Sequence, residues 1–304
     1  MRITLVHFVP NSSVKASLLT NYVYHVPERV TNTVLNISGY RFIKLDYLPL
    51  LQADMQSALA ETGVLGTILI ADEGINIALS GYCKQIAKAI DYFQSDERFR
   101  DIWLKQSHSD QIPFSKLKVR IRHEIIAFDG ANASDKQLHR PPAPAISPQT
   151  VAQWLDDGRD LTLLDTRNAY EIESGTFETA QHLGIAHFRD FQDAVTTALN
   201  EGHLDLHKPM ITFCTGGIRC EKAAPWMIEQ GFTEVYQIEG GVLNYFEKTG
   251  GKHWQGDCFV FDDRVEIDKQ LTPTGATWCK ECQLTIAPNQ VCGCQDSRIA
   301  IDTV

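Results

Sequence analysis

Cys214 stands in the segment whose residue types and spacing are best suited to chemistry. After the short apolar run 210–213 the chain continues with Cys214, Thr215, Gly216, Gly217, Ile218, Arg219 and Cys220. A strand that ends at a cysteine, followed by a glycine-rich loop that opens a helix, directs backbone N–H groups towards one point. Together with the charge of Arg219, such a loop favours an anion, including the thiolate of Cys214 itself.

The loop allows a structural and a catalytic interpretation. A cysteine after a strand is usually a buried structural residue. Here Gly216 and Gly217, which permit backbone conformations closed to other residues, favour a reactive thiolate. The spacing from Cys214 to Arg219 is one residue shorter than the Cys-x5-Arg cradle of cysteine phosphatases, which suits a single sulfur or a small anion. Cys220 either resolves a persulfide on Cys214 as a disulfide or is a helix residue without a role.

Asp165 and Arg167 lie where the predicted strand 161–165 ends. Open α/β sheets place their sites at the carboxyl ends of parallel strands, so both residues are candidates to support the reactive loop. Asp165 would pair with Arg167 or Arg219, and for Asp165 we favour a pair that stabilises the fold. Both roles stay open for Arg167. We expect Glu171 to face solvent or to cap a turn.

Four cations alternate with aliphatic residues late in the N-terminal half. They are Lys116, Lys118, Arg120 and Arg122. Side chains alternate between the two faces of a strand, so all four cations share one face. A solvated face or a charged edge strand would explain one or two of them. Four like charges on one face are better explained by a polyanion, and we predict RNA contact.

Four cysteines close together near the end of the sequence suggest a metal site. They are Cys279, Cys282, Cys292 and Cys294. The first pair has the spacing of a zinc knuckle, whereas the second pair is one residue tighter than usual. So short a segment builds no core of its own, so we favour a structural zinc over reduced thiols in a disordered tail.

Apolar periodicity predicts an α+β ferredoxin-like domain at residues 38–129, after an extension of uncertain structure at 1–37. Strands are expected over 40–45, 65–71, 75–80 and 117–128, and helices over 48–62 and 84–93, in the order βαββαβ. Asp72 and Glu73 fall in the turn between the second and third strands. With Gly74 they are better explained by turn geometry than by a carboxylate site.

Residues 130–147 are rich in proline and small residues and are predicted to be a linker. Strands over 161–165, 210–213 and 235–238 then alternate with helices over 148–155, 191–199, 220–230 and 242–248. This alternation predicts an α/β domain with a parallel sheet at 148–250. Residues 251–304 form a small Cys-rich C-terminal segment.

Composition limits the class of protein further. Of 304 residues, 43% are hydrophobic and 22% charged, which excludes collagen, coiled coils and wholesale disorder. We predict a cytoplasmic protein with no membrane contact, because no apolar run reaches the roughly 20 residues of a membrane helix and no secretory signal is evident. The first 155 residues carry 16 Lys and Arg against 14 Asp and Glu, and the rest carry 12 against 24. An acidic polymer should therefore touch the N-terminal half.

Five stretches of the sequence resemble one protein family in the same order. They are GTILIADEGIN, LLDTRNAYEIESGTF, CTGGIRCEKA, IEGGVLNYFEKTGG and GDCFVFDDRV. Residues 148–250 resemble a rhodanese domain, with DTRNAYEIESG similar to its signature and residues 214–219 similar to its six-residue active-site loop. Together the stretches, over about residues 38–294, resemble the bacterial tRNA uridine(34) hydroxylase family.

This resemblance implies that Cys214 is the persulfide cysteine and that Arg219 belongs to its catalytic loop. It further implies that wobble uridine 34 of tRNA is converted to 5-hydroxyuridine, with molecular oxygen as co-substrate and an electron donor that the residues do not identify. The partner is tRNA, and no protein partner is inferable. The residues alone indicate the alternative, a sulfurtransferase that passes sulfane sulfur through a Cys214 persulfide to a small acceptor. An inactive module that only binds RNA or protein is disfavoured by the intact loop.

Overall fold

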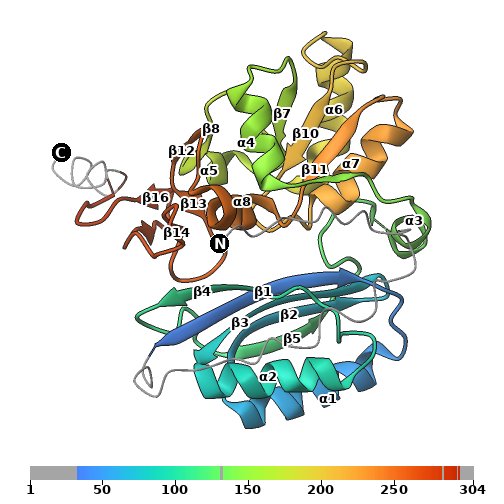
Figure 1. Ribbon diagram of the computed structural model, residues 1–304. Coiled ribbons are helices and arrows are strands. Elements are labelled where there is room, and N and C mark those ends of the chain that lie inside the picture. Colours follow the sequence, from blue (N-terminus) through green and yellow to red (C-terminus); the bar gives the residue numbers. More distant parts are fainter. Residues whose placement is uncertain (1–32, 131–132, 283, 293, 295–304) are drawn as a thin grey trace, which may run out of the picture. The chain divides into compact units, whose positions relative to one another are not determined.

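The computed structural model describes residues 33–130, 133–282, 284–292 and 294. Most of the expected N-terminal extension, residues 1–32, lies outside these ranges. The described chain contains two sheets, each of five strands, followed by a C-terminal segment that contains two short two-stranded pairs and one strand paired with β8 (Gly175–Phe177) of the second domain (Figure 1). No described helix is long and apolar enough to cross a membrane.

The first sheet has the strand order β4-β1-β3-β2-β5, and helices α1 and α2 cover one of its faces (Figure 1). The elements are β1 (Val34–Phe42), α1 (Leu48–Thr62), β2 (Leu65–Ala71), β3 (Gly74–Tyr82), α2 (Cys83–Ser95), β4 (Lys105–Ser109) and β5 (Leu117–Ile121). Alternate aliphatic side chains of the strands pack against Met55, Leu59, Ile86 and Phe93 of the helices. The expected βαββαβ order is present, with β5, which is parallel to β2, as the expected last strand and β4 as an additional strand before it.

Three strand expectations are corrected. β1 begins at Val34, so residues 34–37 belong to the sheet and not to an extension. The apolar pattern is interrupted there by Asn36, a buried polar residue that is hydrogen-bonded to Ser109. The strand β4 was missed, because its sequence KQSHS contains no aliphatic residue and only backbone pairing with β1 forms it. The strand expected over 117–128 ends at Ile121, and the chain then turns around Glu124.

The edge strand β5 is satisfied by side chains of α1. Gln52 donates to the carbonyl of Val119 at 2.8 Å, and the N–H of Val119 donates to Gln56 at 3.1 Å. These amides occupy backbone groups that an edge strand otherwise leaves open to pairing with another chain. Val119 is buried in the helix-covered core, while Arg120 is exposed, which confirms the alternation expected for this strand.

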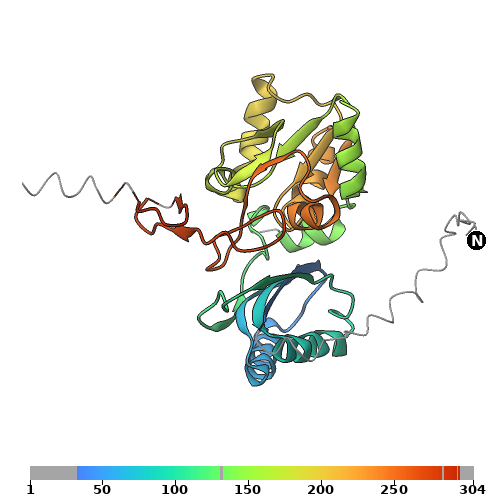
Figure 2. The ribbon, with the colours of Figure 1, turned by 60° about the vertical axis from the view of Figure 1, so that its left-hand side comes forward.

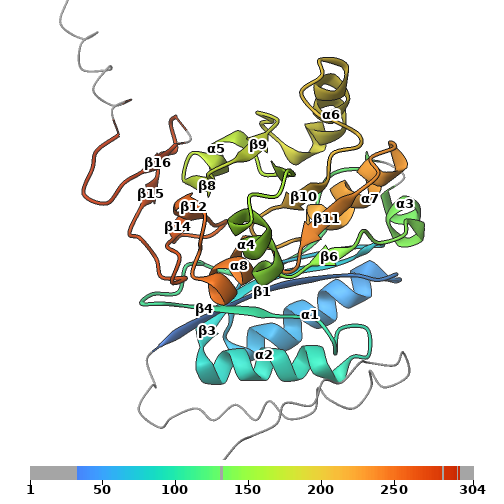
Figure 3. The same ribbon diagram turned by 45° about the horizontal axis from the view of Figure 1, so that its top comes forward.

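The second sheet is entirely parallel, with the order β6-β11-β10-β7-β9. Its strands are β6 (Ala145–Ile146), β7 (Thr162–Asp165), β9 (Ala180–His182), β10 (Met210–Phe213) and β11 (Val235–Ile238). The core on one face includes residues of α4 (Pro148–Asp156) and α8 (Gly241–Thr249). On the other face it includes residues of α6 (Phe191–Asn200) and α7 (Cys220–Glu229) (Figure 3).

The segment expected to be a linker contains regular structure. It holds α3 (Ala133–His139) and β6, and β6 pairs with β11 as an edge of the second sheet. Smaller elements between β7 and α6 are α5 (Ala169–Ile172), β8 (Gly175–Phe177) and the 3-10 turn at Phe188–Asp190. The proline-rich composition hid β6, because a two-residue edge strand needs no apolar run.

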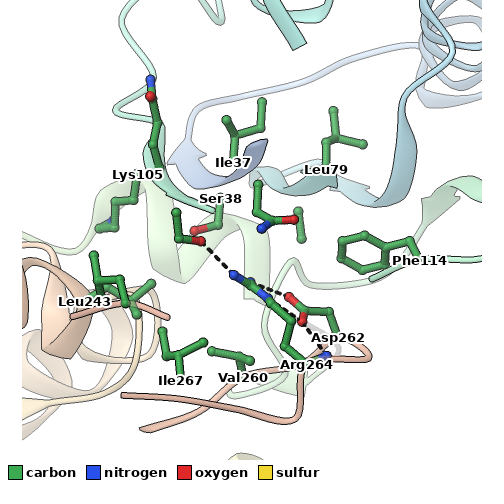
Figure 4. Close-up of a pocket in the computed structure, with 15 residues that line it drawn as sticks. Ile37, Ser38, Leu79, Lys105, Phe114, Leu243, Val260, Asp262, Arg264 and Ile267 are labelled. Atoms are coloured by element: carbon green, nitrogen blue, oxygen red, sulfur yellow. Dashed lines mark hydrogen bonds and ion pairs between the residues drawn. The ribbon is translucent and has the colours of Figure 1, made fainter. Parts of the chain in front are cut away.

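The C-terminal segment contacts both domains. Its strands are β12 (Trp254–Gly256), which pairs with β8, then β13 (Cys258–Phe259), β14 (Glu266–Ile267), β15 (Thr277–Trp278) and β16 (Thr285–Ile286). The β15–β16 pair stands apart from both sheets (Figure 2). Arg264, held by Asp262, donates to Ser107 of β4 at 2.7 Å beside a cavity of about 40 Å³, enough for a water or two (Figure 4).

A buried lysine joins the two domains. Lys222, in the first turn of α7, places Nζ 2.8 Å from Glu73 Oε2 and 2.6 Å from Glu124 Oε2. Lys222 and Glu73 are completely buried. Burial raises the pKa of Glu73, and the charge of Lys222 opposes that rise. The sequence pattern indicated only turn geometry for Glu73. In the structure its carboxylate forms an ion pair with a lysine of the second domain.

Replacing Lys222 by Met should strongly destabilise the folded chain. The change leaves two buried carboxylates without a cation, and breaking a buried pair in this way costs about 3–5 kcal/mol. Those carboxyls would then bind protons more tightly in the folded state than in the unfolded state, so the loss should shrink as pH falls from 7 towards 5. Denaturant titration at both pH values measures this.

The control for this experiment is Lys248→Met, at an exposed lysine of α8. It should change the free energy of unfolding by less than about 0.5 kcal/mol. A Lys222→Met chain that unfolds at the wild-type denaturant concentration would show that the ion pair contributes nothing to folding.

Candidate active site around Cys214

Cys214 directly follows β10 and is 2% exposed at the start of the loop that leads into α7. Its sulfur accepts a hydrogen bond from the N–H of Gly217 at 3.1 Å. Burial by itself raises the pKa of this thiol. The hydrogen bond with Cys220, the charge of Arg219 and the N–H groups of Arg219 and Gly217 outweigh burial and lower the pKa to about 6. The loop is therefore built to hold a thiolate at neutral pH.

Only one of the two loop glycines is required by the backbone. Gly217 has a φ of +98°, and a Cβ there would lie 3.0 Å from the hydroxyl of Tyr40. Gly216 has no such φ, and a Cβ there would meet nothing within 4 Å. The expectation that both glycines serve the conformation is thus corrected. Gly216 leaves open space beside the loop, with Thr215 and Ile218 completing its length.

The N-terminus of α8 holds the loop from the other side. The N–H of Val242 donates to the carbonyl of Cys214 at 3.0 Å, and that of Leu243 donates to Thr215 at 3.1 Å. This approach requires Gly241, whose φ is +67° and whose Cβ would lie 2.4 Å from the Cys214 carbonyl oxygen. The glycine pair of the stretch IEGGVLNYF therefore serves the position of the reactive loop.

Arg219 is fixed by Glu171, which sequence reasoning did not identify as a site residue. Arg219 Nη2 lies 2.8 Å from Glu171 Oε2, and Glu171 is completely buried. The same oxygen accepts the N–H of Asn168, so Glu171 caps its turn but does not face solvent. Within the described chain, Arg219 Nη1 is buried and has no hydrogen-bond partner, which leaves one donor for a bound group.

Asp165 and Arg167 form a separate buried pair. Arg167 Nη2 lies 2.6 Å from Asp165 Oδ2, and both side chains are fully buried. Arg167 also donates to the carbonyl oxygens of Gly175 and Glu171, at 2.7 and 3.3 Å. Asp165 does not pair with Arg219. The pair connects β8 and α5 through hydrogen bonds to their backbone carbonyls, and these contacts suit a structural role.

Cys220 meets Cys214 in the structure. Cys220 is completely buried, and the two thiols are close enough for each to shift the pKa of the other. Burial and the neighbouring Cys214 raise the pKa of Cys220 well above its ordinary value, so it remains a thiol while Cys214 ionises. The two thiols are neighbours, and the resolving role of Cys220 stays a prediction.

The first domain contributes Tyr40 and Lys105 to the surroundings of the Cys214 loop. The hydroxyl of Tyr40 donates to Glu221 at 3.3 Å. Burial, followed by the charges of Glu221, Cys214 and Cys220, raises the pKa of Tyr40. Burial lowers the pKa of Lys105 to about 8, although the negative charges of Cys214 and Glu221 oppose the change. Both side chains thus lie within the electrostatic reach of the reactive thiol.

The strand register places the basic residues of β5 on the same sheet face as Tyr40. Arg120 is opposite Leu69, which is opposite Asn76, which is opposite Tyr40. A second row runs from edge to edge through Lys118, Thr67, Ala78, Ser38 and Lys105. Residues directly opposite each other share a face. Of the four cations, Lys118 is partly buried, and the exposed ones are Lys116, Arg120 and Arg122. Four strand spacings, about 19 Å, separate β5 from β4 across the sheet.

The four C-terminal cysteines come together. The sulfurs of Cys279, Cys282, Cys292 and Cys294 all lie within 4.8 Å of one another. Three of the separations are 3.5, 3.3 and 3.1 Å. A tetrahedron of 2.3 Å Zn–S bonds has edges of about 3.8 Å, so the donor set fits zinc. The tighter spacing of the second pair does not prevent the cluster.

The pKa of Cys214 should be measurable as the midpoint of its alkylation by iodoacetamide against pH, read from the Cys214 peptide by mass spectrometry. We expect a midpoint near 6, because the thiolate is the reactive form and persists down to that pH. Gly217→Ala should raise the midpoint, since the strained backbone moves an N–H away from the sulfur, whereas Gly216→Ala should leave it unchanged. A wild-type midpoint at or above about 8.5, the value of a model thiol, would contradict the anion-binding loop.

Comparison with known proteins agrees with this division of the chain. A family model described as UPF0176 acylphosphatase like domain matches residues 34–125, and one described as Rhodanese-like domain matches residues 147–248. An acylphosphatase-like domain thus precedes a rhodanese domain with a parallel sheet, and the narrower ferredoxin-like description stays a prediction. Among solved structures, the Alr3790 protein from Anabaena sp. covers 36% of this chain and 91% of its own, at 20% identity and a TM-score of 0.31.

Curated relatives match both domains at once. A protein of Bordetella petrii named tRNA uridine(34) hydroxylase is 46% identical over 250 residues, which cover 80% of this chain and 96% of the relative. A protein of the same name from Cupriavidus taiwanensis is 43% identical over 265 residues, covering 84% and 91%. With a thiolate loop of this geometry and relatives this similar over nearly their whole length, the chain belongs to the tRNA uridine(34) hydroxylase family.

Proposed function

We propose that this chain is a cytoplasmic tRNA-modifying enzyme that hydroxylates the wobble uridine 34 of tRNA to 5-hydroxyuridine at the Cys214 loop. The observation that carries the proposal is the Cys214 sulfur, which accepts the N–H of Gly217 and whose pKa the charge of Arg219 helps to lower. The substrate is inferred from the names of the relatives. The loop provides a nucleophilic sulfur that can form a persulfide.

The reaction places an oxygen atom between C5 and its hydrogen on the uracil ring. With molecular oxygen as co-substrate, one atom of O₂ enters the product and the other leaves as water, which requires two electrons and two protons from a donor. The residues of the chain supply a nucleophilic sulfur, a fixed cation at Arg219 and an unpaired guanidinium N–H. These groups can hold a persulfide and an electron-rich group of the substrate close together.

The first domain supports a tRNA substrate in particular. The cations of β5 share the sheet face that carries Tyr40 and Lys105 to the loop. A polyanion bound along that face would run towards Cys214, and each phosphate neutralised would release counterions. The second domain is acidic overall and offers no comparable face in the sequence, so the RNA contact falls to the first domain.

A sulfurtransferase remains the second candidate function, because the Cys214 loop is complete by itself. A persulfide on Cys214 could pass its outer sulfur to a small acceptor without RNA and without oxygen. Alternatively, the Cys220 thiolate would attack the Cys214 sulfur of the persulfide, which forms a Cys214–Cys220 disulfide and releases the outer sulfur as hydrosulfide. The cations of β5 favour the RNA substrate over this alternative.

We also propose that the four C-terminal thiols hold a structural zinc. Purified chain should carry about one zinc, and Cys279→Ser and Cys292→Ser should each remove it, because a structural site needs all four ligands. Metal analysis without chelator, with Cys83→Ser as the control, measures this. Zinc-free wild-type protein purified under reducing conditions would leave the cysteines as ordinary thiols.

Nucleoside mass spectrometry tests the proposed reaction. In cells whose only copy of the gene encodes Cys214→Ser, 5-hydroxyuridine at position 34 should be lost, while tRNA affinity of the purified variant stays near wild type. Cys83→Ser is the matched control, at a cysteine that begins α2. Full-rate hydroxylation by Cys214→Ser would remove the reaction from the rhodanese loop.

Charge reversal tests the RNA face. Lys118→Glu with Arg120→Glu should weaken tRNA binding strongly, and wild-type binding should fall steeply with salt, with a log–log slope of roughly −0.7 to −0.9 for each phosphate contact. Thiosulfate should still react with Cys214 in this variant, because the changed residues lie at the far edge of the sheet. Normal binding and modification by the double variant would make the cations a solvated surface only.

A further inference from the structure

Two exposed aromatic residues border the Cys214 loop and take no part in the chemistry described above. Trp103, before β4, is 47% exposed, and Phe261, after β13, is 60% exposed. In the described ranges only two other aromatic residues are comparably exposed, Tyr47 and Tyr82, at the starts of α1 and α2. Covering a large apolar side chain lowers the free energy of the molecule. Exposed aromatic rings beside a reactive thiol therefore indicate a surface that a ligand covers.

Trp103 lies against the glycine pair that shapes the loop. A Cβ at Gly240 would stand 2.6 Å from Cη2 of Trp103, so the indole contacts the backbone there. The next residue, Gly241, approaches the carbonyl of Cys214 equally closely. The indole ring of the first domain thus contacts the residue before Gly241, the glycine that packs against the Cys214 carbonyl.

Phe261 reaches the same loop from the C-terminal segment. The guanidinium carbon of Arg219 lies 5.5 Å from the centre of the Phe261 ring. Phe259 packs edge-on against Phe261 at 5.3 Å, and Phe259 in turn contacts Tyr170 and Trp278. The exposed ring is therefore held in place by an aromatic cluster, and this explains the aromatic residues of the stretch GDCFVFDDRV.

Lys105 holds the indole and adds positive charge. Its ammonium lies 4.7 Å from the centre of the Trp103 ring and 5.5 Å from that of Tyr40. Figure 4 shows Lys105 extending from β4 at the margin of the small cavity, which is too small for a base. That cavity contains no residue of the Cys214 loop; the loop reaches solvent at Thr215, Gly216 and Ile218, and the two aromatic rings border it at Gly240 and Arg219.

An unpaired base of an RNA loop suits this surface. Proteins recognise single-stranded RNA by stacking splayed bases on aromatic side chains beside cations. The phosphates would follow the basic sheet face, which Lys105 shares with Lys118 through the strand register. A small sulfur acceptor would need neither exposed ring.

We propose that Trp103 and Phe261 form a base-stacking subsite at the Cys214 loop that receives the unpaired uracil of the tRNA anticodon loop. Lys105 is a positioning residue that holds the ring of Trp103. The proposal rests on the proposed function for its ligand and adds the residues that bind the base.

An anticodon stem–loop carrying 5-iodouridine at position 34 tests the subsite without requiring turnover. Irradiation of the complex with the full chain should link the base to Trp103 or Phe261, as read from the linked peptide by mass spectrometry. With the unmodified stem–loop, Trp103→Ala and Phe261→Ala should each weaken binding on the order of 10- to 100-fold, the usual effect of losing a base–aromatic stack.

Two further variants separate stacking from folding. Trp103→Phe should retain most of the affinity, because it keeps an aromatic face. Tyr82→Ala should have no effect, because Tyr82 lies about 20 Å along β3 from the residue opposite Tyr40. The alkylation midpoint of Cys214 should remain near its wild-type value in Phe261→Ala, which shows that the loop is intact.

The outcomes distinguish the subsite from the reaction. If Trp103→Ala and Phe261→Ala bind and hydroxylate the stem–loop as wild type does, or if the crosslink falls on other residues, the subsite is wrong and the reaction stands. If the wild-type chain binds and crosslinks through these rings but makes no 5-hydroxyuridine, the subsite stands and the proposed reaction is wrong.

Discussion

Lys222 is the cation on which the arrangement of this protein depends. It satisfies Glu73 and Glu124 of the first domain from the first turn of α7, the helix that the Cys214 loop opens. A charge without a partner is costly in a buried place, so the three groups hold one another in place. Because α7 is fixed in this way, Tyr40 and Lys105 come within reach of a thiol more than 100 residues away.

At Cys214 the groups that stabilise the thiolate outweigh the effect of burial on the pKa. Burial favours the neutral thiol of Cys214, yet the pKa falls to about 6, roughly 4 kcal/mol in favour of the thiolate relative to a pKa of 9.0. The opposing contributions come from fixed donors: the N–H of Gly217, the Cys220 thiol and Arg219. The ion pair with Glu171 fixes the guanidinium of Arg219, whose charge favours the thiolate. The loop binds an anion because its donors are placed before the anion forms.

The sequence alone determined the elements whose signal is local. The strand Met210–Phe213 has the bounds that its apolar run predicts, and so does the helix Leu48–Thr62, which ends at Gly63. The loop from Cys214 to Arg219 was readable for the same reason, since a strand, two glycines and a helix lie within one short stretch. The four C-terminal cysteines were also recognisable, because metal ligands keep characteristic spacings.

Tertiary structure alone decided the partners. Glu73 and Glu171 had the pattern of turn residues, and only folding brought them to Lys222 and Arg219. The strand β4 has no aliphatic residue and exists because β1 offers it a backbone to pair with. Trp103 carried no signal because the glycine that it contacts lies in the other domain. Periodicity reports which face of an element is buried, but the residue that covers that face is chosen by packing between segments far apart in the chain.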